Sequence, residues 1–447
     1  MKKYDFIAIG GGNAGFAATA KAAEAGKRTA MIDRGPIGGL CSLNGCNPKK
    51  VLVRSSEVLD EIRHATKYGI DVSGVKIDWS RVIDRKETFT NGVTESSEQS
   101  LKERGIDLIT GSARFTAKNR LEINGEEIEF GALLISTGSF PRPLEFPGAE
   151  HVKTTNDILA LRTIPQRLAI IGSGVVAFEF GQVFARAGSQ VTILTPGKKA
   201  LSGEDEDIVN ALVEFSSTLG IKTITKVRVH SSNDKGDRLK MDCETEGESF
   251  SVEADFILNA AGRIPSIGDL ALEKADVQYD KRGIIVNDFL RSISNPNIFA
   301  AGDSHGRLQL SPIATYEGHI VGVNYVDGDV EKADYTSIPR AIYTIPALAS
   351  VGLTEAEARK RGLGIEVHNN EMSKWKVYAI AGEPLARAKI IIEKSTDKIV
   401  GAHLLSPVAA DEIHVFALAL KFGITASQLR QMVYAYPTFS STIPSLL

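Results

Sequence analysis

The sequence predicts an α/β protein in which two similar halves precede a shorter α+β domain. Each half opens with a short apolar strand, a glycine-rich turn and a helix, first near residue 10 and again near residue 172. After residue 335 the pattern changes to apolar strands that alternate with helical segments. With 447 residues, of which 43 % are hydrophobic, the chain can bury the cores of about three domains.

The first glycine turn has the spacing of a dinucleotide-binding site. Asp33 closes the strand after the helix, 23 residues beyond Gly10. The glycines let a pyrophosphate approach the backbone, the helix offers N–H groups, and the carboxylate accepts a ribose hydroxyl. A glycine turn that only packs a helix on a sheet is the alternative. The unit comprises strand Tyr4–Ile9, turn glycines Gly10, Gly12 and Gly15, helix Ala14–Ala25 and strand Thr29–Ile32.

A second motif, GGLCSLNGCNPKK, holds two of the three cysteines. An undistorted helix rises about 7.5 Å over five residues, which separates Cys41 and Cys46 too far for a disulfide. Gly45 can supply the kink that a bridge needs, and a strained bridge is easy to reduce. Two unlinked thiols or half a zinc site are the alternatives, but Cys243 lies far away without partners. The spacing alone leaves these alternatives open, and the dinucleotide-binding pattern beside the motif is what favours a redox-active pair.

The remaining elements of the first half follow from apolar runs, and Pro141, Pro143 and Pro147 mark its end. We expect helices at Val51–His64 and Trp79–Arg104, and strands at Gly111–Phe115, Leu121–Phe130 and Leu133–Gly138.

The second half repeats the unit without its acid. The residue 23 positions after Gly172 is Thr195, and Lys198 and Lys199 follow it. A missing carboxylate beside two cations favours a 2′-phosphate, and hence NADPH over NADH, unless both lysines are solvated loop charges. Asp303 closes NIFAAGD and would point into a ligand crevice unless it only caps a turn. The expected elements are strands Leu168–Ile171, Val191–Leu194 and Phe256–Gly262 and helix Phe178–Ala187.

The last part of the chain reads as an antiparallel sheet with helices, which is an α+β domain. We expect strands at Arg340–Gly352 and Lys389–Leu405, and helices at Thr354–Arg361 and Ala410–Phe422.

Together these motifs resemble the flavin-dependent pyridine nucleotide–disulfide oxidoreductases, which include glutathione reductase, dihydrolipoamide dehydrogenase and mercuric reductase. The likeness spans nearly the whole chain, and GGGNAG, GGLCSLNGCNPKK, ISTG, GSGVVAFE, NAAGRIP and NIFAAGD occur in the family's order. It implies two Rossmann-like dinucleotide-binding domains, for FAD and NAD(P), and a C-terminal dimerisation domain. The implied boundaries are 1–149 with 265–335 for FAD, 150–264 for NAD(P), and 336–447 for the interface of a homodimer.

The resemblance also implies the cofactor contacts, with FAD and NADPH expected and NADH as a possible substitute. The residues assigned to FAD are Gly10, Gly12, Ala14, Gly15, Asp33, Ala113, Thr137, Gly138, Asp303 and Ser311. Those assigned to NAD(P) are Gly172, Gly174, Ala177 and Gly262, to which we add Lys198 and Lys199.

The same resemblance implies roles around the cysteines. Cys46 matches the thiolate nearest the flavin, and Cys41 matches the interchange thiol that attacks the substrate. Lys49 or Lys50 matches a lysine beside the flavin ring, and Glu179 matches that lysine's carboxylate partner.

The C-terminal motif departs from the family. Its disulfide-reducing members carry His-Pro-Thr with a nearby Glu, whereas this chain has Tyr436-Pro437-Thr438 with Ser441. Imidazole titrates at about pH 6.5 and phenol at about pH 10, so a tyrosine can donate a proton but is a poor base at neutral pH. Tyr436 is therefore either a proton donor or an aromatic residue that fills the interface.

The expected function is electron transfer from NADPH through flavin to Cys41–Cys46 and on to a disulfide acceptor. One alternative is a reductase of metal ions or quinones, which needs no thiol protonation. The resemblance disfavours mercury, because mercuric reductases carry a C-terminal cysteine pair that delivers the metal and no cysteine follows Cys243 here. Another alternative is a slow, redox-sensing flavoprotein.

Charge and composition limit the partners. Lys and Arg total 52 against 55 Asp and Glu, so the net charge of −3 gives no reason to expect nucleic acid. No apolar stretch reaches the about 18 residues of a membrane helix. Three cysteines fit a reducing compartment. We expect a cytoplasmic protein with a small-molecule acceptor, no membrane partner and no metal site.

Overall fold

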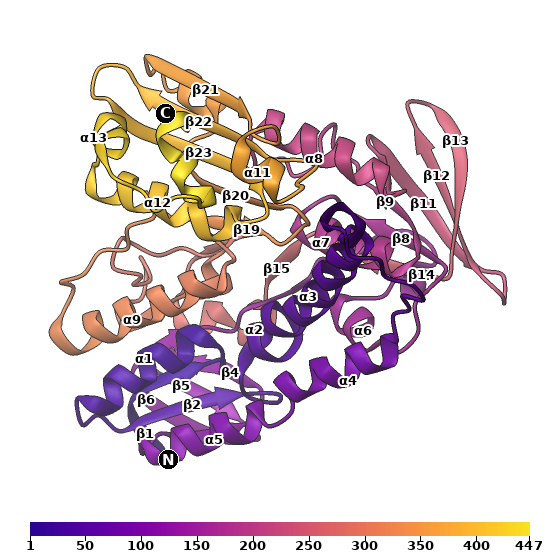
Figure 1. Ribbon diagram of the computed structural model, residues 1–447. Coiled ribbons are helices and arrows are strands. Elements are labelled where there is room, and N and C mark those ends of the chain that lie inside the picture. Colours follow the sequence, from indigo (N-terminus) through magenta and orange to yellow (C-terminus); the bar gives the residue numbers. More distant parts are fainter. The chain divides into compact units, whose positions relative to one another are not determined.

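The computed structural model describes residues 1–447, and the chain forms two compact units (Figure 1). The first unit comprises Met1–Val51, Arg81–Pro143 and Gly262–Ala333. The second unit comprises Leu52–Ser80, Leu144–Ala261 and Asp334–Leu447. Segments far apart in the sequence thus meet within each unit. The expected division into three domains stays a prediction.

The first unit is built on a seven-stranded sheet in the order β3-β2-β1-β6-β5-β4, with β18 paired to β6. The strands β1, β2, β3, β6 and β18 pair in parallel, whereas β4, β5 and β6 pair antiparallel. Two small ladders, β7–β15 and β16–β17, complete the unit. The strands are β1 (Lys2–Ile9), β2 (Thr29–Asp33), β3 (Asp107–Thr110), β4 (Ala113–Ala117), β5 (Arg120–Ile123), β6 (Glu126–Ile135), β7 (Ser139–Pro141), β15 (Arg263–Pro265), β16 (Tyr279–Asp280), β17 (Gly283–Ile284) and β18 (Ile298–Ala300).

The strands of this sheet present apolar side chains to both faces, and helices cover one of them. Phe6 and Ala8 face α1 and α9, and Met31 packs with Leu101 of α5. The helices α1 and α9 approach closely, since a Cβ at Gly318 would lie 2.3 Å from the Ala14 carbonyl oxygen. The helices are α1 (Asn13–Glu24), α2 (Gly39–Asn44), α4 (Trp79–Thr90), α5 (Val93–Glu103) and α9 (Ser311–Asp327), and α3 (Cys46–Arg63) begins in this unit.

The second unit contains three sheets. A parallel sheet has the order β10-β9-β8-β14, and antiparallel sheets have the orders β11-β12-β13 and β19-β20-β23-β22-β21. Cys243 lies on β12 and is 2 % exposed. The strands are β8 (Arg167–Ile171), β9 (Gln190–Leu194), β10 (Lys222–Ile224), β11 (Val227–Asp234), β12 (Leu239–Thr245), β13 (Glu248–Ala254), β14 (Phe256–Asn259), β19 (Arg340–Ile342), β20 (Ala347–Gly352), β21 (Ile365–Glu371), β22 (Arg387–Glu393) and β23 (Lys398–Ser406).

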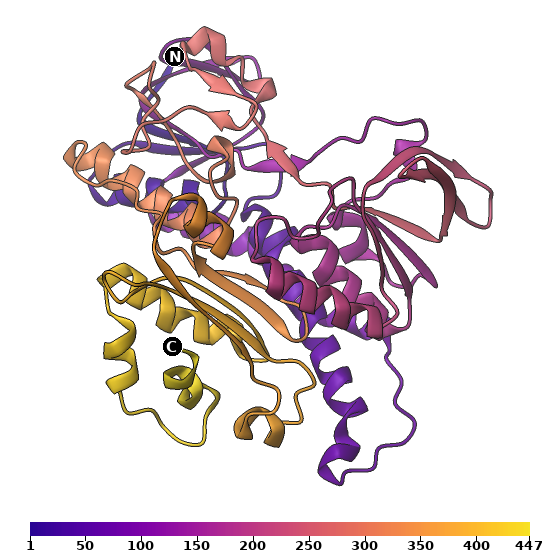
Figure 2. The same cartoon turned by 90° about the horizontal axis from the view of Figure 1, so that it is seen from above.

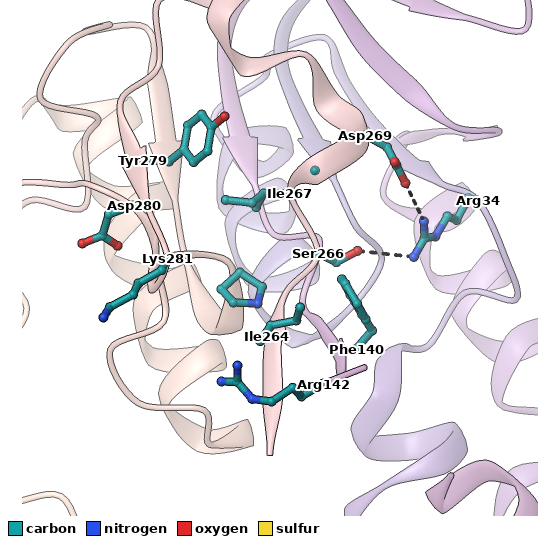
Figure 3. A pocket seen from close by; sticks show the side chains of 12 residues that line it. Arg34, Phe140, Arg142, Ile264, Ser266, Ile267, Asp269, Tyr279, Asp280 and Lys281 are labelled. Carbon is teal, nitrogen blue, oxygen red and sulfur yellow. Dashed lines mark hydrogen bonds and ion pairs between the residues drawn. The ribbon is translucent and has the colours of Figure 1, made fainter. Parts of the chain in front are cut away.

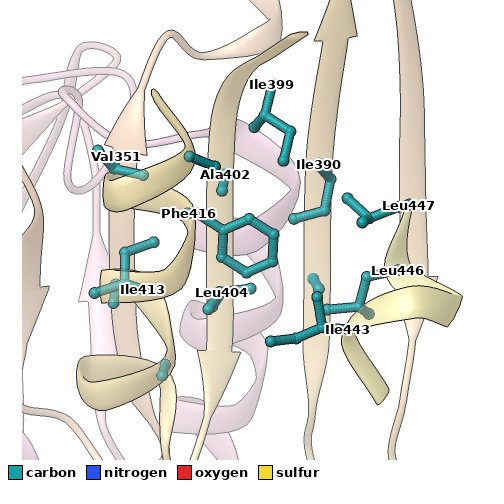
Figure 4. Packing of buried hydrophobic residues seen from close by; sticks show 14 of the residues in the cluster. Val351, Ile390, Ile399, Ala402, Leu404, Ile413, Phe416, Ile443, Leu446 and Leu447 are labelled. Carbon is teal, nitrogen blue, oxygen red and sulfur yellow. The ribbon is translucent and has the colours of Figure 1, made fainter. Parts of the chain in front are cut away.

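Helices α12 and α14 form the core of the C-terminal part with the five-stranded sheet (Figure 4). Phe416 and Ile413 of α12 lie over Leu404 and Ile390, and Ile443 of α14 closes the same cluster. Figure 2 shows the C-terminal helices together beside this sheet. The helices of the second unit are α6 (Thr155–Ala160), α7 (Val175–Ala187), α8 (Glu206–Thr218), α10 (Glu355–Lys360), α11 (Lys376–Ile380), α12 (Ala409–Phe422), α13 (Ala426–Gln431) and α14 (Ile443–Leu446).

A polar stripe on α7 binds the backbone that leads into β20. The carboxylate of Glu179 accepts a hydrogen bond from the Tyr343 amide at 2.8 Å, and the Gln182 side-chain oxygen accepts one from the Ile345 amide at 2.8 Å. The guanidinium of Arg186, 1 % exposed, donates to the Ile345 carbonyl and pairs with Asp60. This stripe joins the parallel sheet to the C-terminal part within the second unit.

Several elements differ from the sequence prediction. The single helix expected at Trp79–Arg104 is two helices, because Gly92 adopts a left-handed φ of 82° between α4 and α5. The strand expected at Leu121–Phe130 is split into β5 and β6 by a turn at Asn124 and Gly125. The strands expected at Arg340–Gly352 and Lys389–Leu405 are also split, each into two antiparallel strands. Helix α3 begins at Cys46, before the expected Val51.

Both strand–turn–helix–strand units are confirmed to within a few residues as β1–α1–β2 and β8–α7–β9. No helix has the combination of length and apolar character that a bilayer crossing requires.

Candidate cofactor and redox site

A pocket of the first unit is lined by several of the residues that the sequence analysis assigned to FAD. Gly10, Asp33, Ala113 and Thr137 line it together, although they come from four different elements or turns. The carboxylate of Asp33 accepts hydrogen bonds from the Gly11 amide at 2.6 Å and from the Gly35 amide at 2.9 Å. These bonds fix the carboxylate at the end of β2, where a ribose hydroxyl would meet it.

The residues of this pocket fit an adenosine-containing dinucleotide. The Thr137 hydroxyl is buried and has no hydrogen-bond partner, so it can serve a ligand. A Cβ at Gly10 would lie 2.2 Å from the Ser136 carbonyl oxygen, whereas at Gly12 no atom comes nearer than 3.8 Å. Gly10 is therefore required by packing, and Gly12 leaves open space in front of α1 for a pyrophosphate.

A cavity of about 620 Å³ continues from this pocket along the same unit. Figure 3 shows Arg34 beside Ser266 and Asp269, at 3.3 Å from the Ser266 hydroxyl and 3.7 Å from the Asp269 carboxylate. All three residues line both hollows. None of the three was predicted from the sequence. Arg34 could have been, because it directly follows Asp33, whereas Ser266 and Asp269 come from a distant segment.

Asp303 lies in a polar network at the end of β18. Its carboxylate accepts a hydrogen bond of 2.6 Å from the Ser139 hydroxyl. The Ser139 hydroxyl oxygen in turn accepts a hydrogen bond of 2.8 Å from the Arg263 guanidinium. Burial lowers the pKa of Arg263, and the charge of Asp303 opposes that shift. The β7–β15 ladder brings Ser139 and Arg263 together, which local sequence patterns could not indicate.

The two cysteines flank a break between helices. Gly45 separates α2 from α3 with φ −138° and ψ −114°, and Cys46 is the first residue of α3. Both cysteines are free thiols, with Cys41 half-buried and Cys46 exposed. The expected kink at Gly45 is therefore present, and the pair is in its dithiol form.

The two thiols share one proton. A hydrogen bond from Cys46, with further help from Ser311 and the charge of Lys49, lowers the pKa of Cys41 to about 6. The same hydrogen bond raises the pKa of Cys46. The pair titrates as a unit, so it carries one negative charge near neutral pH. The lowered pKa of Cys41 favours that charge on Cys41, whereas the resemblance implies a flavin-facing thiolate on Cys46.

Ser311 connects the cysteines to the first glycine turn. The Asn13 side-chain amide, at the start of α1, donates to the Ser311 hydroxyl at 2.7 Å. That hydroxyl in turn bonds Cys41. Because Ser311 is the first residue of the 17-residue helix α9, the positive end of the helix also faces the thiolate.

Of the residues assigned to NAD(P), Gly172, Gly174 and Ala177 lie at the second glycine turn and the start of α7, and Lys198 and Lys199 follow β9. A Cβ at Gly172 would lie 2.1 Å from the Ala260 carbonyl oxygen, Gly174 precedes α7 with open space around it, and Ala177 is buried. Lys198 and Lys199 are exposed, and Lys199 pairs with Glu206. Gly262 belongs to the first unit, so its part in this site stays a prediction.

The remaining catalytic assignments also stay predictions. Glu179 is 2 % exposed and belongs to the second unit, while Lys50 belongs to the first. Tyr436 is 68 % exposed on the single chain. The hydroxyl of Ser441, at the position of the family's Glu, donates to the Thr438 carbonyl of its own turn.

Comparison with known proteins agrees with this geometry. Residues 4–318 match the family model "Pyridine nucleotide-disulphide oxidoreductase", and residues 338–446 match that family's dimerisation domain. A mercuric reductase of Staphylococcus aureus is 33 % identical over 98 % of this chain and 80 % of its own. A dihydrolipoyl dehydrogenase of Bacillus subtilis is 34 % identical over 98 % of this chain and 97 % of its own.

Among solved structures, the HOCl-induced flavoprotein disulfide reductase RclA from Escherichia coli is similar to this chain. It has a TM-score of 0.88 at 27 % identity and covers 99 % of both chains. The Cu(II) complex of the same reductase has a TM-score of 0.90 at 27 % identity, and covers 100 % of this chain and 99 % of its own.

Proposed function

Because the chain belongs to the pyridine nucleotide–disulphide oxidoreductases, and is thus a flavin-dependent oxidoreductase that uses NAD(P)H, we propose that it passes electrons from NADPH through FAD to Cys41–Cys46 and on to a disulfide acceptor. One observation carries this proposal. The cysteine pair, whose shared proton leaves a thiolate near neutral pH, contacts the start of α9 in the unit that holds the adenosine pocket.

The cysteine pair performs the thiol chemistry. The thiolate of Cys41 attacks one sulfur of the acceptor disulfide, and the other acceptor sulfur leaves with the bonding pair and takes a proton. The Cys46 thiol then loses its proton and attacks the Cys41 sulfur of the mixed disulfide. This step releases the second acceptor thiol and closes the Cys41–Cys46 disulfide. Reopening the bridge takes two electrons, which a flavin held by this unit would supply from NADPH.

The chain's own residues bind and orient the cofactor. We assign the adenosine half of FAD to the pocket of Asp33, Ala113 and Thr137, the pyrophosphate to the open backbone at Gly12, and the ribityl chain to Asp303. The buried, unpaired hydroxyl of Thr137 and the fixed carboxylate of Asp33 support this assignment.

NADPH is the proposed electron donor. Thr195 stands at the end of β9, where an acid would accept the ribose hydroxyls of NADH. Lys198 is exposed nearby, whereas Lys199 already pairs with Glu206, so Lys198 is the better candidate for a 2′-phosphate. A comparison of KM for NADPH and NADH tests this choice. Lys198→Ala is expected to raise KM for NADPH alone, and an equal rise for both donors would contradict it.

The decisive experiment is an anaerobic NADPH titration of the purified protein. Two-electron reduction of the wild type is expected to give a long-wavelength absorption band from a thiolate in contact with the flavin. Cys46→Ser should lack the band, and Cys243→Ser should keep it because Cys243 is buried among strands of the second unit. If the wild type shows only free reduced flavin, the proposed relay is wrong.

A second acceptor class is supported by the missing His at position 436. General acid–base help is typically worth about 10²- to 10⁴-fold, and metal ions or quinones do not need it. One relative is a mercuric reductase, and one similar structure is a Cu(II) complex. Cys41→Ser separates the two classes. Loss of all turnover supports disulfide reduction, retained quinone or copper reduction supports the second class, and slow turnover on every acceptor in the wild type supports a redox sensor.

A further inference from the structure

Glu317 on α9 is a buried carboxylate with two defined partners in the first unit. It is 0 % exposed, and one of its oxygens accepts a hydrogen bond of 2.6 Å from the Gly302 amide. Its other oxygen lies 2.9 Å from the Nε2 atom of His305, which therefore donates. A buried carboxylate without these partners would be costly, so Glu317, Gly302 and His305 depend on one another for their positions.

These two bonds hold the residues at the two ends of the turn that contains Asp303. Gly302 and His305 are the first and last residues of the 3₁₀ turn Gly302–His305, and Asp303 lies between them. The Ser304 hydroxyl also anchors the turn, by donating to the Ile135 carbonyl at 2.8 Å. Three of the four residues are thus tied to the surrounding elements. The side chain of the fourth, Asp303, is turned to Ser139.

The same two bonds tie the turn to α9. This helix packs against α1, and its first residue contacts Cys41. The turn, the glycine-rich loop and the thiol pair therefore share a common support. The Nε2 atom of His305 is engaged by Glu317 and its side chain is 4 % exposed, so this histidine does not replace the missing acid–base group.

We propose that His305 and Glu317 are positioning residues, whose hydrogen-bonded pair holds the Gly302–His305 turn so that Asp303 binds the flavin half of FAD. This inference rests on the proposed function, in which Asp303 holds the ribityl chain. The adenosine pocket is lined by other residues, so the pair acts on one half of the cofactor only.

The test compares FAD with ADP on the apoprotein. ADP fills the adenosine pocket but has no ribityl chain, so it reports the fold of the unit without Asp303. Dissociation constants for both are measured for the wild type, His305→Ala, Glu317→Leu and Glu317→Gln. His319→Ala is the matched control, because His319 lies two residues further along α9 and is exposed.

We expect His305→Ala and Glu317→Leu to bind FAD about tenfold to a hundredfold more weakly, as for the loss of hydrogen bonds to a charged group. Both should bind ADP within twofold of the wild type. Glu317→Gln should restore most of the FAD affinity, because its amide can accept from Gly302 and donate to His305. His319→Ala should bind both ligands normally.

Two results would overturn the inference. One is unchanged FAD affinity in both His305→Ala and Glu317→Leu. The other is an equal loss of FAD and ADP binding, which would indicate a general loss of the fold. Failure of the wild type to bind FAD at all would instead refute the proposed function, and the wild-type titration reveals it before any variant is compared.

Discussion

At the scale of single residues, Ser311 adds to the hydrogen bond from Cys46 in lowering the pKa of Cys41. Its hydroxyl accepts from Asn13 at 2.7 Å and bonds Cys41, whose pKa is lowered to about 6. Because the hydroxyl stabilises the thiolate form, Ser311→Ala is expected to raise the pKa of Cys41 by about one unit. The rate of Cys41 alkylation by iodoacetamide, measured against pH with peptide mapping, reports the shift.

Thr315→Ala is the matched control for this prediction, because Thr315 is exposed one turn further along α9. An unchanged alkylation profile in Ser311→Ala would contradict the role of the hydroxyl. A raised pKa should also slow disulfide reduction near pH 6 more than near pH 8, where the thiolate forms in either protein.

Glu412 on α12 is a residue whose charge opposes folding. It is 5 % exposed, one of its oxygens has no partner, and burial raises its pKa to about 7. The unfolded carboxyl ionises near about pH 4.3, so stability falls as the pH rises from there to 7. Glu412→Gln should match the wild type near pH 4 and be roughly 3 kcal/mol more stable at pH 8.

Urea unfolding at the two pH values measures this difference. The control is Glu248→Gln, because Glu248 is exposed on β13. Glu383, whose pKa burial also raises to about 7, adds to the loss in both proteins and cancels in the comparison. A Glu412→Gln variant that loses stability at pH 8 would show that the charge is compensated by groups around it.

At the scale of elements, Lys389 on β22 joins the start of α8 to α10. Its ammonium group lies 3.1 Å from Asp205, 2.8 Å from Asp207 and 2.6 Å from Glu355. Lys389 and Asp205 are almost fully buried, at 4 % and 3 % side-chain exposure. Lys389→Met leaves the Asp205 carboxylate buried without its cation, and we expect a loss of about 3–5 kcal/mol in the free energy of unfolding.

Denaturant titration of the apoprotein measures this loss. Lys394→Met is the control, because Lys394 lies one residue beyond β22 and is exposed. A loss below about 1 kcal/mol in Lys389→Met would mean that the network behaves like a surface ion pair.

The elements also show what a sequence pattern can and cannot predict. β1, α1 and β2 were predictable because a buried strand, a glycine turn and a small-residue helix leave a local signal. The expected helix from Trp79 was wrong at Gly92, since one glycine in a helical pattern is weak evidence for a break. The strand break at Asn124 and Gly125 had a recognisable turn dipeptide, which the apolar run outweighed.

The candidate site divides in the same way. Gly10, Asp33, Ala113 and Thr137 could be assigned from motifs, and they line one pocket. Ser139 and Arg263 were not assigned, because a short antiparallel ladder between distant segments brings them to Asp303. The partnership of His305 with Glu317 was equally out of reach. It depends on how α9 packs, not on the spacing of either residue.

At the scale of the whole molecule, the dimerisation domain exposes an apolar C-terminal segment on the single chain. Val433 is 96 % exposed, Met432 52 % and Tyr436 68 %. An exposed apolar patch of this kind is typical of a surface that another subunit covers. The family's dimerisation domain supports a homodimer, and we propose that Tyr436 then serves the partner subunit's cysteines.

A mixed dimer tests where Tyr436 acts. Cys41→Ser and Tyr436→Phe homodimers should both reduce a disulfide poorly, the second by about 10²-fold or more if the phenol donates a proton. A heterodimer of the two variants contains one site with an intact cysteine pair and an intact partner Tyr436. It should recover about half of the wild-type turnover, which a coupled assay on differently tagged subunits measures. No recovery would place Tyr436 with its own subunit's cysteines, whereas normal turnover of the Tyr436→Phe homodimer would place it outside catalysis.

Because the third cysteine is buried, a count of the accessible thiols reports on the other two alone. Cys243 is enclosed by strands of the second unit, and burial raises its pKa to about 11. In the folded protein, a mild thiol reagent should therefore count two sulfurs, and in urea it should count three. Any oxidant dose that abolishes the native count will have reached only Cys41 and Cys46, so thiol loss can be read directly as the oxidation state of the pair.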